Sequence, residues 1–137
     1  MPSLKRRVLC AETHPDVNAI ISLLLEQQGH EVKAAKTLHE CLELARKEHF
    51  DLYMLDDGYT DGTNVELCRQ LRKLSPETPI LFFSSKAFPR DRQAAMEAGA
   101  EAYLTKPMDI LGIAEAVNAI LLSRAPGASN GESRGQR

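Results

Sequence analysis

Two hydrophobic patterns alternate along the chain. Short, continuous apolar runs are followed by longer segments in which apolar residues recur every three or four positions. Runs of the first kind are typical of buried strands, and spacing of the second kind is typical of amphipathic helices. Five such pairs predict an α/β fold built around a parallel sheet. The expected strands are residues 8–11, 31–35, 52–55, 80–83 and 102–105, and the expected helices are residues 17–25, 38–45, 65–74, 89–98 and 110–121.

The starts of three expected helices share one polar signature. In each case a threonine precedes the apolar stripe, and an acidic residue follows three positions later. This spacing predicts a capping box, in which the hydroxyl and the carboxylate accept hydrogen bonds from backbone N–H groups that the helix start leaves free. The three pairs are Thr13/Asp16, Thr37/Glu40 and Thr63/Glu66.

Polar side chains follow four of the expected strands, at the position where each strand ends. In an open parallel sheet, ligands bind in the crevice at the carboxyl ends of the strands. Carboxylates, hydroxyls and one ammonium group are therefore expected to converge there, a set that suits a phosphoryl group and a divalent cation. These residues are Glu12 and Thr13, Asp56 and Asp57, Ser84 and Ser85, and Lys106.

Composition narrows the class of protein. The 137 residues include 17 Lys+Arg and 19 Asp+Glu, which gives a net charge of −2. This near balance disfavours direct nucleic-acid binding, which usually requires a basic surface. No apolar run is as long as a membrane span, and the apolar segment near the start is too short for a signal peptide. We therefore expect a cytoplasmic protein that does not bind a membrane.

The chain is expected to form one domain, over residues 1–122. Residues 123–137 are rich in Gly and Ser and carry almost no apolar side chain, which predicts a flexible tail or linker. The three cysteines are widely spaced and form no metal or redox motif, so we expect them to be reduced and mostly buried. They are Cys10, Cys41 and Cys68.

The strand-end residues and their surroundings carry a family resemblance. Asp56 ends an apolar strand, Ser84 ends the next, and a Tyr-Leu-Thr-Lys-Pro run with Lys106 follows a glycine. This combination resembles the receiver domain of bacterial two-component response regulators, from about Arg7 to Leu122. The segments that carry the resemblance are residues 8–17, 51–56, 82–85, 98–100 and 103–107.

The resemblance implies a flavodoxin-like, doubly wound fold: a five-stranded parallel sheet in the order 2-1-3-4-5 with five helices. It implies that Asp56 is the phosphoacceptor and that Lys106 contacts both Asp56 and the phosphoryl oxygens. Ser84 would follow the phosphoryl group by hydrogen bonding, and Tyr103 would turn inward as a switch residue, unless Tyr103 is only a packing residue. Such a domain is not an enzyme beyond catalysing its own aspartyl phosphorylation and dephosphorylation.

The resemblance also implies Mg²⁺, held by Glu12, Asp56 and the backbone carbonyl of Gly58. The family usually has a second acid where this chain has Thr13, and the loss of one anionic ligand weakens the binding of a hard dication. Because Thr13 is expected to cap the following helix, its role as a metal ligand is doubtful. His14 and Asp57 lie beside these residues, and we expect a surface histidine at the helix start and a solvated carboxylate.

Partners and alternatives follow from the same comparison. The phosphodonor would be a histidine kinase or a phosphotransfer protein, and the signal would pass to a downstream protein or a fused output domain. The fourth helix, fifth strand and fifth helix would form the output surface, and a homodimer would use the same surface.

Thr13 leaves open a second function, that of a degenerate receiver that binds a partner without phosphorylation. A phosphatase of the haloacid dehalogenase type is disfavoured because Gly58 stands where a second acid is needed, and residues 11–15 lack the glycines of a dinucleotide site.

Overall fold

The computed structural model describes residues 5–124 and confirms the predicted alternation of strands and helices. A short 3₁₀ turn, Ile110–Gly112, precedes the last helix, and the predicted tail lies outside the described residues from position 125 onward. The strands are β1 (Arg7–Ala11), β2 (Glu31–Ala35), β3 (Leu52–Leu55), β4 (Ile80–Ser84) and β5 (Ala102–Thr105), and the helices are α1 (Pro15–Glu26), α2 (Leu38–Lys47), α3 (Asn64–Leu74), α4 (Pro89–Glu97) and α5 (Ile113–Ser123).

The strands form one parallel sheet in the order β2-β1-β3-β4-β5, which confirms the flavodoxin-like, doubly wound topology. The order reverses beside β1, where β2 lies on one side and β3 on the other. Ala11, the last residue of β1, is in register with Leu55, the last residue of β3. The residues that follow these two strands therefore emerge side by side at the switch point, where open α/β sheets bind ligands.

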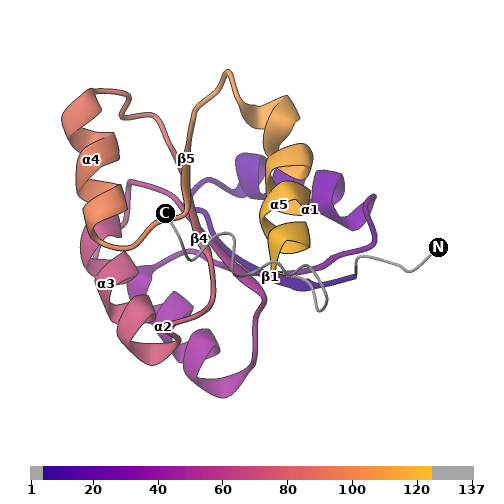
Figure 1. Ribbon diagram of the computed structural model, residues 1–137, viewed down its shortest axis with the longest axis horizontal. Helices are drawn as coiled ribbons and strands as arrows, with labels where there is room; N and C mark the ends of the chain where they lie inside the picture. Colours follow the sequence, from indigo (N-terminus) through magenta and orange to yellow (C-terminus); the bar gives the residue numbers. More distant parts are fainter. Residues whose placement is uncertain (1–4, 125–137) are drawn as a thin grey trace.

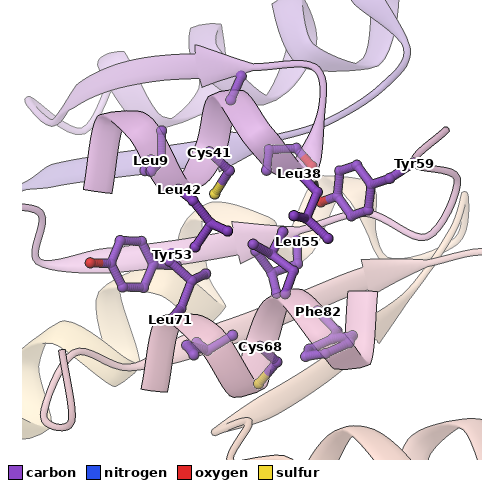
Figure 2. Packing of buried hydrophobic residues seen from close by; sticks show 14 of the residues in the cluster. Leu9, Leu38, Cys41, Leu42, Tyr53, Leu55, Tyr59, Cys68, Leu71 and Phe82 are labelled. Atoms are coloured by element: carbon purple, nitrogen blue, oxygen red, sulfur yellow. Dashed lines mark hydrogen bonds between the residues drawn. The ribbon is translucent and has the colours of Figure 1, made fainter. Parts of the chain in front are cut away.

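Helices cover both faces of the sheet (Figure 1). α1 and α5 lie together on one face, and α2, α3 and α4 lie on the other. Because side chains of a strand alternate between faces, β1 contributes to both hydrophobic cores: Val8 and Cys10 pack with α1 and α5, and Leu9 packs with α2 and α3. Figure 2 shows the second core from close by, with side chains of α2, α3 and the sheet packed together.

The threonine half of the predicted capping box is confirmed at two of the three helix starts and is wrong at the third. The carboxylate half differs at α2, because Glu40 Oε1 accepts from the Lys36 N–H at 2.7 Å instead of the N–H of Thr37. The hydroxyl oxygens of Thr37 and Thr63 accept hydrogen bonds from the backbone N–H groups of Glu40 and Glu66, each at 3.0 Å. α1 starts differently, because its N-cap residue is His14 and no side chain among residues 5–124 caps it. Pro15 begins the helix, which removes one N–H group that would otherwise need a partner. The predicted capping role of Thr13 is therefore incorrect.

The cysteines behave as expected from their spacing. All three are buried and free, and burial raises the pKa of the Cys41 thiol to about 12 and that of the Cys68 thiol to about 11. Within residues 5–124, no helix combines the length and the apolar character that crossing a membrane requires.

Candidate functional site

Asp56 lies directly after β3 and is almost completely buried, with 1% of its surface exposed. Its two carboxylate oxygens have different partners. Lys106 Nζ donates to Oδ1 at 2.6 Å, whereas Oδ2 accepts from the Thr13 backbone N–H at 3.0 Å and from the Thr13 hydroxyl at 2.6 Å. Residues that follow two other strands, β1 and β5, thus hold the carboxylate that follows β3 in a fixed orientation.

Lys106 follows β5 and reaches across the carboxyl ends of the sheet. Its backbone N–H donates to the Ser84 carbonyl at 2.9 Å, which continues the β4–β5 pairing by one residue. Its ammonium group contacts Asp56 and also donates to Glu12 Oε2 at 3.0 Å. Two buried carboxylates therefore share one cation.

The charges of this group follow from burial and contact. Burial by itself raises the pKa of Asp56, but the hydrogen bonds from Lys106 and Thr13 outweigh it and hold that pKa well below the usual range. Burial and the adjacent Asp56 carboxylate raise the pKa of Glu12. Burial opposes the charge of Lys106, but the two carboxylates raise its pKa above the ordinary value. Asp56 is consequently a carboxylate and Lys106 an ammonium at neutral pH.

Thr13 belongs to this site rather than to the helix start. Its hydroxyl donates to the charged Asp56 carboxylate at 2.6 Å, and the N-cap of α1 is the next residue, His14. A hydrogen bond to a charged acceptor is stronger than one to a neutral partner. The site therefore takes the hydroxyl that the sequence pattern assigned to the cap.

Ser84 and Asp57 form a second network beside the first. The Ser84 hydroxyl donates to Asp57 Oδ2 at 2.6 Å, and the same oxygen accepts from the backbone N–H and the hydroxyl of Ser85, both at 2.9 Å. One oxygen of Asp57 is therefore held by three donors, and the side chain is half-buried rather than fully solvated as the sequence predicted. Sequence reasoning missed this contact because it joins residues 27 positions apart.

Two tyrosines connect the site to the rest of the fold. The Tyr103 side chain points inward, stacks on Phe82 and donates its hydroxyl to the Lys86 carbonyl at 2.6 Å. Tyr59, which the sequence analysis passed over, accepts from the Asp56 backbone N–H at 2.8 Å and donates to the Ala11 carbonyl at 2.5 Å. Its hydroxyl thereby joins the ends of β1 and β3 under Asp56. An aromatic residue three positions after a strand-end acid was the only signal for it.

Comparison with known proteins decides the family. Residues 8–118 match the response regulator receiver domain. The chain belongs to this family. This match confirms the resemblance that the strand-end residues indicated, and the receiver domain is a signalling module of two-component systems.

Individual relatives, compared by sequence and by structure, are also response regulators or receiver domains. The receiver is 36% identical over 103 residues to the KDP operon transcriptional regulatory protein KdpE of Escherichia coli, covering 75% of this chain and 45% of KdpE. It is 31% identical to the transcriptional regulatory protein CreB of the same species, covering 85% of this chain and 51% of CreB. A CheY-like receiver domain of Methanospirillum hungatei superposes with a TM-score of 0.80 at 27% identity, covering 85% of this chain and 93% of that one. The chain spans about half the length of these curated relatives.

Receiver domains typically bind Mg²⁺, and the donor set of this site fits a divalent cation. Glu12 and Asp56 supply two buried carboxylates, and one oxygen of each lies within 4.8 Å of the other and of a His14 ring nitrogen. Carboxylate oxygens are the ligands that hard dications prefer. Gly58 lies in the same loop, close enough to Thr13 that a β-carbon on Gly58 would stand 3.7 Å from the Thr13 hydroxyl oxygen.

Proposed function

We propose that Asp56 is the phosphoacceptor of this receiver and takes a phosphoryl group from the phosphohistidine of a histidine kinase or a phosphotransfer protein. A carboxylate oxygen of Asp56 forms the new bond to phosphorus as the bond to the histidine nitrogen breaks, and that nitrogen keeps the electron pair. The observation that carries the proposal is the ionised Asp56, held by Lys106 and Thr13 at the switch point of the sheet. The domain is modified in this reaction and turns over no separate substrate.

The neighbours of Asp56 have distinct parts in this proposal. Mg²⁺, held by Glu12, Asp56 and the Gly58 carbonyl, would neutralise charge on the transferring phosphoryl group. Lys106 already lies 2.6 Å from the nucleophilic carboxylate, so its ammonium group can bind a phosphoryl oxygen after a small movement. Thr13 fixes the second carboxylate oxygen and keeps the nucleophile oriented.

A chain of contacts supports Ser84 and Tyr103 as the switch. The Ser84 hydroxyl accepts from the Lys86 backbone N–H at 3.0 Å, and the Lys86 carbonyl accepts from the Tyr103 hydroxyl. Arg92 of α4 lies over the Tyr103 ring, 5.0 Å from its centroid, and donates to the Tyr103 carbonyl at 3.2 Å. A movement of Ser84 toward a phosphoryl group would therefore change the contacts of Lys86 and Tyr103, and through them the contact between Tyr103 and Arg92 of α4.

The surface of α4, β5 and α5 is accordingly our proposed output surface. Phe88 and Met96 expose 60% and 41% of their surface at or on α4, which gives this side apolar contact area for a partner. A downstream protein, a fused output domain or a second copy of the receiver would bind there, in the cytoplasm. The near balance of charge argues against direct binding of nucleic acid by this domain.

Intact-mass spectrometry tests the proposal directly. The whole chain incubated with acetyl phosphate and Mg²⁺ should gain one phosphoryl group, and Asp56→Asn should gain none. Asp57→Asn is the matched control, because it removes the adjacent carboxylate and should still be phosphorylated. Absence of any mass gain in the wild type, or an equal gain in Asp56→Asn, would contradict the proposal and favour a receiver that acts without phosphorylation.

A further inference from the structure

His14 reaches into the site from the start of α1. Its Nδ1 atom lies 3.1 Å from Glu12 Oε2 and 3.7 Å from Asp56 Oδ2, and its backbone N–H donates to Glu12 Oε2 at 3.2 Å. Among residues 5–124, it is the only histidine within 4 Å of two carboxylates. His14 lies at the helix start, as its position in the sequence predicts, but its ring points toward Glu12 and Asp56, which the sequence did not predict.

The distances suit a shared cation. Two ligands that occupy neighbouring corners around a dication, each about 2.1 Å from it, lie roughly 3 Å apart. The Nδ1 to carboxylate distances of 3.1 and 3.7 Å are close to this separation. The two carboxylates are buried and fixed by Lys106 and Thr13, whereas 65% of the His14 side chain is exposed. The His14 Nδ1 atom lies at hydrogen-bond distance from Glu12 Oε2, at 3.1 Å, and from the Thr13 hydroxyl, at 3.2 Å.

The chemistry of the donors favours a particular class of ion. Thr13 supplies no charge where an acid would, so the anionic attraction for Mg²⁺ is reduced. An imidazole nitrogen contributes little to binding Mg²⁺, but it is a good ligand for first-row transition dications, whose affinity for nitrogen rises from Mn²⁺ to Co²⁺ and beyond. The Thr13 and His14 pair therefore replaces a charged oxygen ligand by a neutral nitrogen ligand.

We propose that His14 Nδ1 completes a ligand set with Glu12 and Asp56 and that this set shifts the preference of the receiver from Mg²⁺ toward first-row transition dications. The inference rests on the proposed function, because the ion would serve the same Asp56. His14 adds a ligand that carries no charge, so its removal should weaken the binding of transition dications more than that of Mg²⁺.

Titration calorimetry on the whole chain with Co²⁺, Mn²⁺ and Mg²⁺ at one pH tests this assignment. His14→Ala should weaken Co²⁺ binding about tenfold or more, Mn²⁺ binding less, and Mg²⁺ binding by no more than about twofold. His14→Asp should reverse the order of preference, since a carboxylate restores charge and removes the nitrogen: compared with the wild type, Mg²⁺ should bind more tightly and Co²⁺ less tightly. Paramagnetically shifted imidazole resonances of the Co²⁺ form should vanish in His14→Ala.

His49→Ala is the matched control, because His49 is exposed and contacts a single carboxylate, Asp51, at 3.2 Å. It should leave all three affinities unchanged. The inference is overturned if no ion binds saturably, if His14→Ala affects the three ions equally, or if His49→Ala has the same effect. Phosphorylation of the wild type in excess Mg²⁺ is scored separately by mass, so a failure at Asp56 and a failure at His14 give different results.

Discussion

Asp56 and Asp57 are neighbours in the chain, yet they belong to two separate networks. Asp56 turns toward β1 and β5, where it meets a cation, a hydroxyl and a backbone N–H. Asp57 turns toward the end of β4, where it meets only neutral donors from Ser84 and Ser85. Successive residues at a strand end point in opposite directions, and this alternation separates the two carboxylates.

The difference shows how one strand end can hold both a reactive group and its sensor. Asp56 is buried and compensated by Lys106, so its charge and orientation are fixed before any ligand arrives. Ser84, the residue expected to bind a phosphoryl group, donates its hydroxyl to Asp57 instead. A phosphoryl group on Asp56 would therefore compete with Asp57 for the same hydroxyl proton.

The largest effect is expected from breaking the charged network. Lys106→Met removes the cation and leaves Glu12 and Asp56 as two adjacent buried carboxylates. We expect the free energy of unfolding at neutral pH to fall by about 3 kcal/mol, because an uncompensated buried charge is costly. Urea unfolding followed by circular dichroism measures this change.

The added variant Glu12→Gln in the Lys106→Met background separates charge from packing. Removing one of the two carboxylates should restore part of the lost stability, since the repulsion between like charges disappears. If the double variant is no more stable than Lys106→Met alone, lost packing of the lysine side chain explains the effect.

A smaller effect is expected at Thr13. Thr13→Val keeps the branched shape but loses the hydroxyl that donates to Asp56, which should cost about 2 kcal/mol. Thr37→Val provides a comparison, because it removes a helix cap and should cost about 1 kcal/mol. Amide hydrogen exchange distinguishes the two: exchange should speed up in the first turn of α2 for Thr37→Val, and stay unchanged in the first turn of α1 for Thr13→Val. Faster exchange in α1 would restore the capping role.

The smallest effect is expected at Asp57, which accepts hydrogen bonds from Ser84 and Ser85. Asp57→Asn removes one negative charge beside Asp56 and weakens the hold on Ser84. The rate of phosphorylation by acetyl phosphate should rise roughly threefold, and the gain should shrink at about 1 M salt, where charge repulsion is screened. Ser85→Ala, which removes one hydroxyl but keeps the Asp57 charge, should leave the rate unchanged. A slower reaction in Asp57→Asn would show that Asp57 assists the phosphodonor.

The central pair of the site could be predicted from the sequence. Asp56 and Lys106 each end an apolar run, and the carboxyl ends of parallel strands meet, so their approach follows from the pattern. The contacts of Thr13, Asp57 and His14 could not be predicted in the same way. Each of these side chains has a plausible local role, as a cap, a solvated acid or a surface ring. Each also lies close to a residue that the fold brings from elsewhere in the chain: Asp56 for Thr13 and His14, and Ser84 for Asp57.

The sequence by itself determined the alternation of five strands and five helices, the caps at Thr37 and Thr63, and the edge of the sheet at which the polar residues gather. These features depend on periodicity and on contacts within one helical turn. Only the tertiary structure decided which donor each carboxylate receives. Such choices compare a local hydrogen bond with one to a buried charge, and the strength of the latter depends on burial and distances that exist only after the strands have paired.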